Sequence, residues 1–271
     1  MAKFTGTGNH NVTLKEIELP KTESKRLHLV DVKARVATDI KLTFGSNIKA
    51  SIKRVPFDGS KGIWVVDIKG RNDGKTTLTA QFGNEVATVD IKVFTKTMII
   101  LPLESTQHGM LTRLFLAESI NPGNSLLYNE KESKMSMIWM RQVIENRLKH
   151  KTPYIFGAKK PSGQGKYTIY DIVKAKNQFH GFEDYPKTFS VIKVNITGFV
   201  TIANDYNHPK RKLYADFIEN AKMAASESAL NGFFDESLKG LYGWRTKGAS
   251  APGGSFKEYK SLAGQTFYTL K

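Results

Sequence analysis

Alternation of apolar and polar positions dominates the first third of the chain. Side chains of a β-strand point alternately to opposite faces, so a two-residue period predicts a strand with one buried face. Turn sequences such as Asn72-Asp-Gly74 and Gly83-Asn84 separate the alternating runs. Many short strands with frequent turns predict an all-β sandwich over residues 1–96. The predicted strands are seven: 12–14, 26–32, 40–44, 48–52, 62–68, 76–82 and 85–94.

The hydrophobic period changes to that of helices near residue 97. Apolar positions then recur every three or four residues, the spacing of one helix face. Helices are predicted at 111–120, 133–148 and 209–230, with shorter helix or strand segments at 167–176 and 189–202. The sequence therefore predicts a second domain, 97–271, of the helix-rich α+β class.

Composition narrows the chemistry that this chain can perform. Its 271 residues are 40% hydrophobic and 24% charged, as in an ordinary globular protein, and include no cysteine. Disulfides, thiolate metal ligands and a cysteine nucleophile are thereby excluded. The six histidines form no HxxxH or HxH pair, and Ser119 lies in no Gly-x-Ser-x-Gly turn. Serine, threonine or acid/base chemistry is left, and these patterns give little support to a zinc peptidase or a serine hydrolase.

The formal net charge of +16 predicts attraction to a polyanion. Residues 1–96 hold 17 basic and 10 acidic residues, and residues 97–271 hold 24 and 15. This even distribution disfavours a nucleic-acid binder, which usually concentrates its charge on one face or tail. Peptidoglycan, which carries free carboxylates, is an equally good electrostatic partner. A DNA-binding protein remains a weaker alternative, which would show steeply salt-dependent affinity.

One carboxylate stands out on the first predicted helix. Leu111, Leu114, Phe115 and Glu118 occupy positions i, i+3, i+4 and i+7, which places Glu118 on the stripe that faces the core. Removal from water disfavours the charged carboxylate and raises its pKa, as a general acid requires. Alternatively, Glu118 ends a short helix and points to solvent.

Five short segments in order carry a resemblance to a known family. They read LFLAES at 114–119, VIENR at 143–147, YDIV at 170–173, NQFHGF at 177–182 and LAGQTFY at 262–268. Together they resemble the cell-wall hydrolase family that includes spore cortex-lytic enzymes. The resemblance implies a lysozyme-like domain that cleaves the bond between N-acetylmuramic acid and N-acetylglucosamine, as a lytic transglycosylase or a muramidase, with Glu118 as catalytic acid and no cofactor. Similarly, the hairpin at 74–93 resembles the closing strands of bacterial immunoglobulin-like domains.

The same resemblance suggests further site residues. Glu132 best matches a second acidic residue of the family, although a carboxylate there also suits the first turn of a helix. Asn146 is matched to an Asn-Arg pair that binds substrate or braces the helix end. Gln178 and Phe179 are candidates to contact a sugar through an amide and an aromatic face. Tyr268 is a further candidate, with core packing as the alternative.

The sequence departs from the family's pattern in two ways. Extra residues, including Gly123-Asn-Ser-Leu-Leu-Tyr128, lengthen the link between the first motif and the Asn-Arg pair. Gln265 stands where the family often has histidine, so a role for this side chain is in doubt.

The beginning of the chain bears on the expected location. It lacks the apolar stretch of a secretory signal, and no run of about 18 apolar residues occurs. We therefore expect synthesis in the cytoplasm without a signal peptide, no membrane insertion, and action in the periplasm or on the cell wall after non-classical delivery. An antibacterial toxin delivered by type VI secretion, or a phage tail component, fits this expectation.

The expected partners follow from that interpretation. Peptidoglycan glycan strands are the substrate. A secretion-apparatus or phage-tail protein would contact the N-terminal domain, and an immunity protein is a further candidate. The alternative function is a non-catalytic cell-wall-binding or phage tail structural protein.

Overall fold

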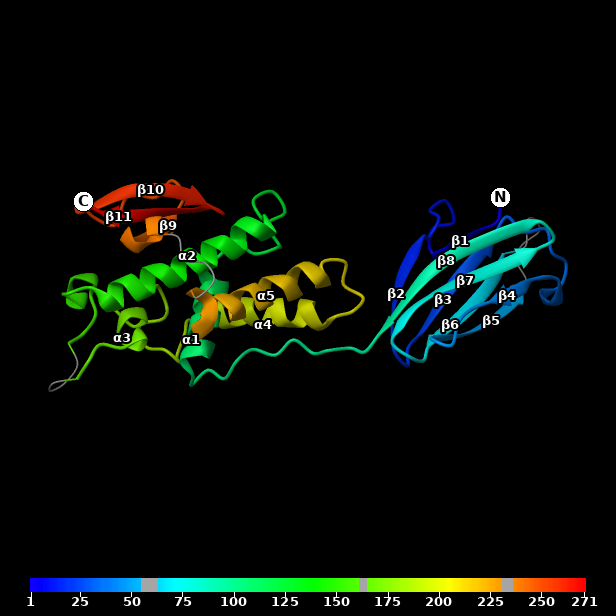
Figure 1. Ribbon diagram of the computed structural model, residues 1–271, viewed down its shortest axis with the longest axis horizontal. Coiled ribbons are helices and arrows are strands. Elements are labelled where there is room, and N and C mark those ends of the chain that lie inside the picture. Colours follow the sequence, from blue (N-terminus) through cyan, green and yellow to red (C-terminus); the bar gives the residue numbers. More distant parts are fainter. Residues whose placement is uncertain (55–62, 161–164, 231–235) are drawn as a thin grey trace. The chain divides into compact units, whose positions relative to one another are not determined.

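The computed structural model describes residues 1–54, 63–160, 165–230 and 236–271. The chain divides into two compact units, Met1–Thr97 and Met98–Lys271, each with a hydrophobic core of its own (Figure 1). Residue 62, the expected start of one strand, lies outside the described residues.

The first unit consists of two four-stranded sheets. Alternate side chains of both sheets are buried in one core, which includes Trp64, Leu29, Leu78 and Val89. One sheet has the order β1-β3-β6-β5 and the other the order β2-β8-β7-β4. The strands are β1 (Lys3–Thr5), β2 (Glu16–Pro20), β3 (Ser24–Val30), β4 (Lys41–Thr43), β5 (Ile48–Arg54), β6 (Trp64–Gly70), β7 (Gly74–Phe82) and β8 (Glu85–Phe94).

The second unit packs helices beneath a small sheet. A three-stranded antiparallel sheet of order β10-β11-β9 lies on α2, and α5 packs against α1, α2 and α4 (Figure 1). No helix of the described residues has the length and apolar character needed to cross a membrane. The elements are α1 (Gln107–Glu118), α2 (Glu130–Lys149), α3 (Ile169–Val173), α4 (Ser190–Asn204), α5 (Arg211–Ala225), β9 (Leu241–Thr246), β10 (Phe256–Leu262) and β11 (Gln265–Leu270).

The fold class predicted from the sequence is wrong. An immunoglobulin-like sandwich followed by a helix-rich, lysozyme-like domain was expected. The described residues instead form a mixed, sheet-rich α+β structure with eleven strands and five α-helices. Strands dominate the N-terminal part, but a sheet also closes the C-terminal part.

Several features of the structure leave no clear pattern in the local sequence. Strand β10 exposes most of its side chains, so its sequence shows no apolar alternation. In the first unit, residues 12–14 form no strand but lie between β1 and β2, with one isolated bridge from Thr13 to Thr5. Strand β2 pairs with β8 in parallel, which no local pattern indicates. Helices α1 and α2 begin earlier than predicted because Thr106 and Asn129 cap them by accepting backbone N–H bonds.

Candidate active site

Glu118 is the last residue of α1 and is partly buried. The helix packs its apolar side chains, among them Leu111, Leu114 and Phe115, into the core of the second unit. Its C-terminal end brings the Glu118 carboxylate to the edge of the sheet. There the indole Nε1–H of Trp244 on β9 donates a hydrogen bond to Oε2 of Glu118 (3.2 Å).

The backbone of Glu118 is held from a second strand. Nε2 of Gln265, at the start of β11, donates to the carbonyl oxygen of Glu118 (2.6 Å). The last carbonyls of a helix lack partners within the helix, so this bond satisfies one of them. The preceding Gly264 has φ +72°, and a Cβ there would lie 2.2 Å from Cδ1 of Ile120. The tight β10–β11 turn thus needs glycine to approach the end of α1.

Burial raises the pKa of Glu118 above its ordinary value. Two nearby groups oppose this effect by favouring the charged carboxylate: the hydrogen bond from Trp244 and the electrostatic influence of His180. Desolvation is the largest of the three influences. The site therefore holds a carboxyl group that keeps its proton at a higher pH than an exposed glutamate.

Glu118 lines a cleft of about 380 Å³. Polar side chains predominate along it, and a second carboxylate, Glu183, is among them. One oxygen of Glu183 accepts the backbone N–H of Gly181 (2.8 Å), which fixes the loop that also carries His180. The lining residues are Glu118, Asn177, Gln178, His180, Glu183, Trp244, Arg245, Thr246 and Ala249.

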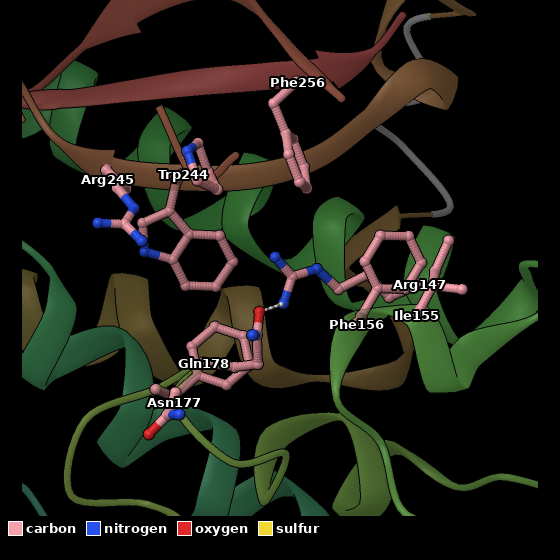
Figure 2. A pocket seen from close by; sticks show the side chains of 10 residues that line it. Arg147, Ile155, Phe156, Asn177, Gln178, Trp244, Arg245 and Phe256 are labelled. Atoms are coloured by element: carbon pink, nitrogen blue, oxygen red, sulfur yellow. Dashed lines mark hydrogen bonds between the residues drawn. The ribbon is translucent and has the colours of Figure 1, made fainter. Parts of the chain in front are cut away.

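A smaller cavity of about 140 Å³ adjoins the cleft through four lining residues that both share, Asn177, Gln178, Trp244 and Arg245. Figure 2 shows the guanidinium of Arg147 directed toward Gln178 and Trp244 in this cavity. The other lining residues are Ile155, Phe156, Phe179, Pro252 and Phe256. Cleft and cavity together form a groove with an acidic and an aromatic, cationic part.

The structure gives Asn146 a bracing position. Its side chain is buried, and Nδ2 donates to the carbonyl oxygens of Leu238 (2.9 Å) and Leu241 (2.7 Å). Oδ1 accepts from Nε2 of Gln142 (2.7 Å). Asn146 lines neither the cleft nor the cavity, and it ties α2 to the start of β9.

Glu132 is not brought to Glu118. It is exposed in the first turn of α2 and lines neither the cleft nor the cavity. A negative charge there is favoured by the helix dipole, which is sufficient reason for its presence. Glu183, which the sequence patterns did not single out, is the carboxylate that shares the cleft with Glu118.

Two of the three remaining sequence-predicted residues reach the groove. Gln178 lines both parts, and its Oε1 accepts from Nη1 of Arg147 (2.9 Å). Phe179 is 3% exposed, contacts the cavity with its ring, and lies 5.0 Å from the ring of Trp244. Tyr268 is 3% exposed and packs edge-on against Phe256, outside the lining of both parts.

Several groove residues were missed in the sequence. Trp244 and Arg245 lie on β9, a strand that was not predicted, and His180 and Glu183 lie on a loop with no regular period. His180 falls within the quoted segment 177–182, so that segment was the available signal. Within the described ranges, no three His, Cys, Asp or Glu side chains gather closely enough to hold a metal ion.

Comparison with protein-family models gives no match, and neither does comparison with curated proteins. Among solved structures, domains 4 and 5 of the S-layer protein SbsC are 14% identical over 30% of this chain and 48% of that one, with a TM-score of 0.23. SbsC domains 1–6 are 13% identical over 37% and 14%, with a TM-score of 0.26. Amebosin is 17% identical over 29% and 88%, with a TM-score of 0.22. The chain thus spans less than half of the S-layer structures, and TM-scores this low support no inference about function.

Proposed function

We propose that the protein cleaves the glycan strands of peptidoglycan, with Glu118 as the general acid. The observation that carries the proposal is the position of this carboxyl group. It is desolvated enough to raise its pKa, it is oriented by Trp244, and it lines a cleft of about 380 Å³. A carboxyl group whose pKa is raised by burial and that faces a polar cleft is suited to protonating a glycosidic oxygen.

The chemistry of the proposed step needs one carboxyl group. The proton of Glu118 moves to the oxygen between N-acetylmuramic acid and N-acetylglucosamine, and the bond from the muramic acid C1 to that oxygen breaks. The primary hydroxyl of the same muramic acid then bonds to C1 and returns its proton to the Glu118 carboxylate. No water is consumed, and the product ends in an anhydro ring. Trp244 keeps the carboxylate in place during both proton transfers.

Convergence of the resemblance segments at the cleft supports the proposal. The segment 114–119 supplies Glu118, the segment 177–182 supplies Gln178 and His180, and the segment 262–268 supplies Gln265. These segments are far apart in the sequence. Their meeting around one carboxyl group is the arrangement that a shared site requires.

Glu183 favours hydrolysis as a second candidate reaction. A glycosidase that uses water needs a second carboxylate, either to activate the water or to bond the sugar. Glu183 lines the same cleft and accepts only the backbone N–H of Gly181 among the described residues. In that case the product would be a reducing end, and Glu118 would keep its role as acid. Loss of activity on changing Glu183→Gln would favour hydrolysis over ring closure.

The test of the proposal compares two glutamates. Wild-type protein, Glu118→Gln and Glu132→Gln are incubated with purified sacculi, and the soluble glycan is measured. We expect Glu118→Gln to lose at least about a hundredfold in rate, because general acid catalysis contributes about 10²–10⁴-fold. Glu132→Gln should retain activity, since Glu132 is exposed away from the cleft. Equal activity of wild type and Glu118→Gln would refute Glu118 as the general acid. No activity in any of the three proteins would refute catalysis and leave a wall-binding role in its place. The delivery route and the partners of the first unit stay predictions.

A further inference from the structure

The smaller cavity contains a buried positive charge without a counter-charge. Arg147 is 4% exposed, and none of the ion pairs among the described residues involves it. Burial lowers its pKa to about 10, so the guanidinium remains charged at neutral pH. Proteins rarely bury a charge unless an opposite charge or several hydrogen bonds compensate it. Arg147 therefore has capacity for an anion.

The hydrogen bonds of Arg147 leave one edge of its guanidinium free of described partners. Nε donates to the carbonyl oxygen of Tyr242 (2.7 Å) and Nη1 donates to Oε1 of Gln178 (2.9 Å). No described residue accepts a hydrogen bond from Nη2. The planar group lies 5.1 Å from the ring centre of Phe156 and 5.5 Å from that of Phe179, which fixes its orientation. A fixed guanidinium fork matches the two oxygens of a carboxylate.

Two further groups converge on the same cavity. Arg245 is exposed, lines the cavity, and forms no ion pair with a described residue. Asn177 lines it as well and holds its backbone at φ +61°, a left-handed conformation that is uncommon for residues other than glycine.

The distribution of charge separates the two parts of the groove. The described residues that line the cavity include Arg147 and Arg245 and no carboxylate. The adjoining cleft shares Arg245 but includes the two carboxylates Glu118 and Glu183. The cavity volume of about 140 Å³ is well above the roughly 10–15 Å³ that one water molecule needs. It can take a small charged group attached to a larger ligand in the cleft.

We infer that the cavity is a subsite for a carboxylate of the ligand, which Arg147 and Arg245 bind while the Phe156 and Trp244 rings contact its carbon atoms. The identity of the ligand as a wall fragment rests on the proposed function, but the subsite does not. In a wall fragment the carboxylate has two sources. It is the lactyl group of muramic acid where the stem peptide has been removed, or a free carboxylate of the stem peptide where the peptide remains.

Binding measurements on the full chain test this inference without turnover. The chain carrying Glu118→Gln is titrated calorimetrically with three probes of equal glycan length. These are a GlcNAc-MurNAc tetrasaccharide with free lactyl carboxylates, the same tetrasaccharide with its stem peptides, and chitotetraose, which has no carboxylate. Two variants are added, Arg147→Lys, which keeps the charge but loses the fork, and Arg245→Gln, an exposed change that leaves the core intact. Arg71→Gln makes the same change of charge at a residue of the first unit that lines neither the cleft nor the cavity.

We expect at least one carboxylated probe to bind about tenfold or more tightly than chitotetraose, since a hydrogen-bonded charge pair contributes about that factor or more. Arg147→Lys should reduce this preference about tenfold and Arg245→Gln about threefold, while the affinity of both variants for chitotetraose stays the same. Arg71→Gln should show the same preference as the protein without it. The probe that shows the preference identifies the source of the carboxylate.

Three results would overturn the subsite: equal affinity for all probes, no saturable binding of any probe, or an equal loss for all probes in both arginine variants. If Arg147→Lys fails to fold by circular dichroism, Arg245→Gln decides. The wild type's activity on sacculi is a separate result. Carboxylate preference without cleavage would refute the proposed catalysis alone, and cleavage without preference would refute the subsite alone.

Discussion

The replacement Asn146→Ala separates a bracing role from substrate binding. Asn146 makes three buried hydrogen bonds, two to backbone carbonyls near the start of β9 and one from Gln142. Each bond contributes about 0.5–1.5 kcal/mol net, so we expect the free energy of unfolding to fall by about 3 kcal/mol. A domain of about 150–250 residues loses about 2–4 °C in Tm per kcal/mol, which gives a decrease of about 6–12 °C for the second unit.

Thermal unfolding followed by circular dichroism measures this decrease. Asn195→Ala, the same change at an exposed position of α4, should shift the free energy of unfolding by less than about 0.5 kcal/mol. Below its lowered Tm, the folded Asn146→Ala protein should bind chitotetraose as the wild type does. An unchanged Tm together with weakened sugar binding would refute the bracing role and restore Asn146 as a substrate-binding residue.

Three further predictions concern the carboxyl group of Glu118. In Trp244→Phe the carboxylate loses a hydrogen bond that favours its charged form, so its pKa rises further and the alkaline limb of the pH–rate profile should move to higher pH; a move to lower pH would contradict this. Glu118→Gln should be more stable than wild type at alkaline pH. Because the pKa of Glu118 is raised in the folded state, its contribution to the free energy of unfolding is full below the ordinary value of 4.5 and is lost as pH rises through the folded-state pKa. Parallel curves of Tm against pH for the two proteins would contradict this prediction. Gln265→Met removes the hydrogen bond to the Glu118 backbone and should lower the rate about tenfold or more, as small misplacements of a catalytic group do. Gln265→His keeps a donor and should retain most of the wild-type rate. Equal rates in both variants would exclude this positioning role.

Sequence patterns located most helices and the strands with strict alternation. Strands β7 and β8 were visible because buried and exposed side chains alternate along them, and helices α1, α2 and α5 because each buries apolar residues. The fold class was still predicted wrongly. Which strands pair, as in the parallel β2–β8 pair, depends on contacts far apart in the sequence, and the final sheet exposes much of β10.

The candidate site shows the same division. Glu118 could be found because it continues an apolar helix face, and Gln178 because it belongs to a resemblance segment. Glu183 and Arg245 could not, because only tertiary packing brings a loop and an unpredicted strand beside the end of α1. Glu132 was chosen because it best matched the second acidic residue of the family, but it lies in the first turn of α2 and the fold leaves it in solvent.

The most direct measurement of the central claim is mass spectrometry of the soluble products from purified Gram-negative sacculi. Wild-type protein and Glu118→Gln are compared at equal concentration. Proton transfer from Glu118 with internal ring closure predicts anhydro-muropeptides from the wild type and none from Glu118→Gln. Reducing-end products from the wild type alone would keep Glu118 as the acid and assign hydrolysis. Absence of glycan fragments from the wild type, or the same fragments from both proteins, would contradict the claim that Glu118 cleaves the glycan.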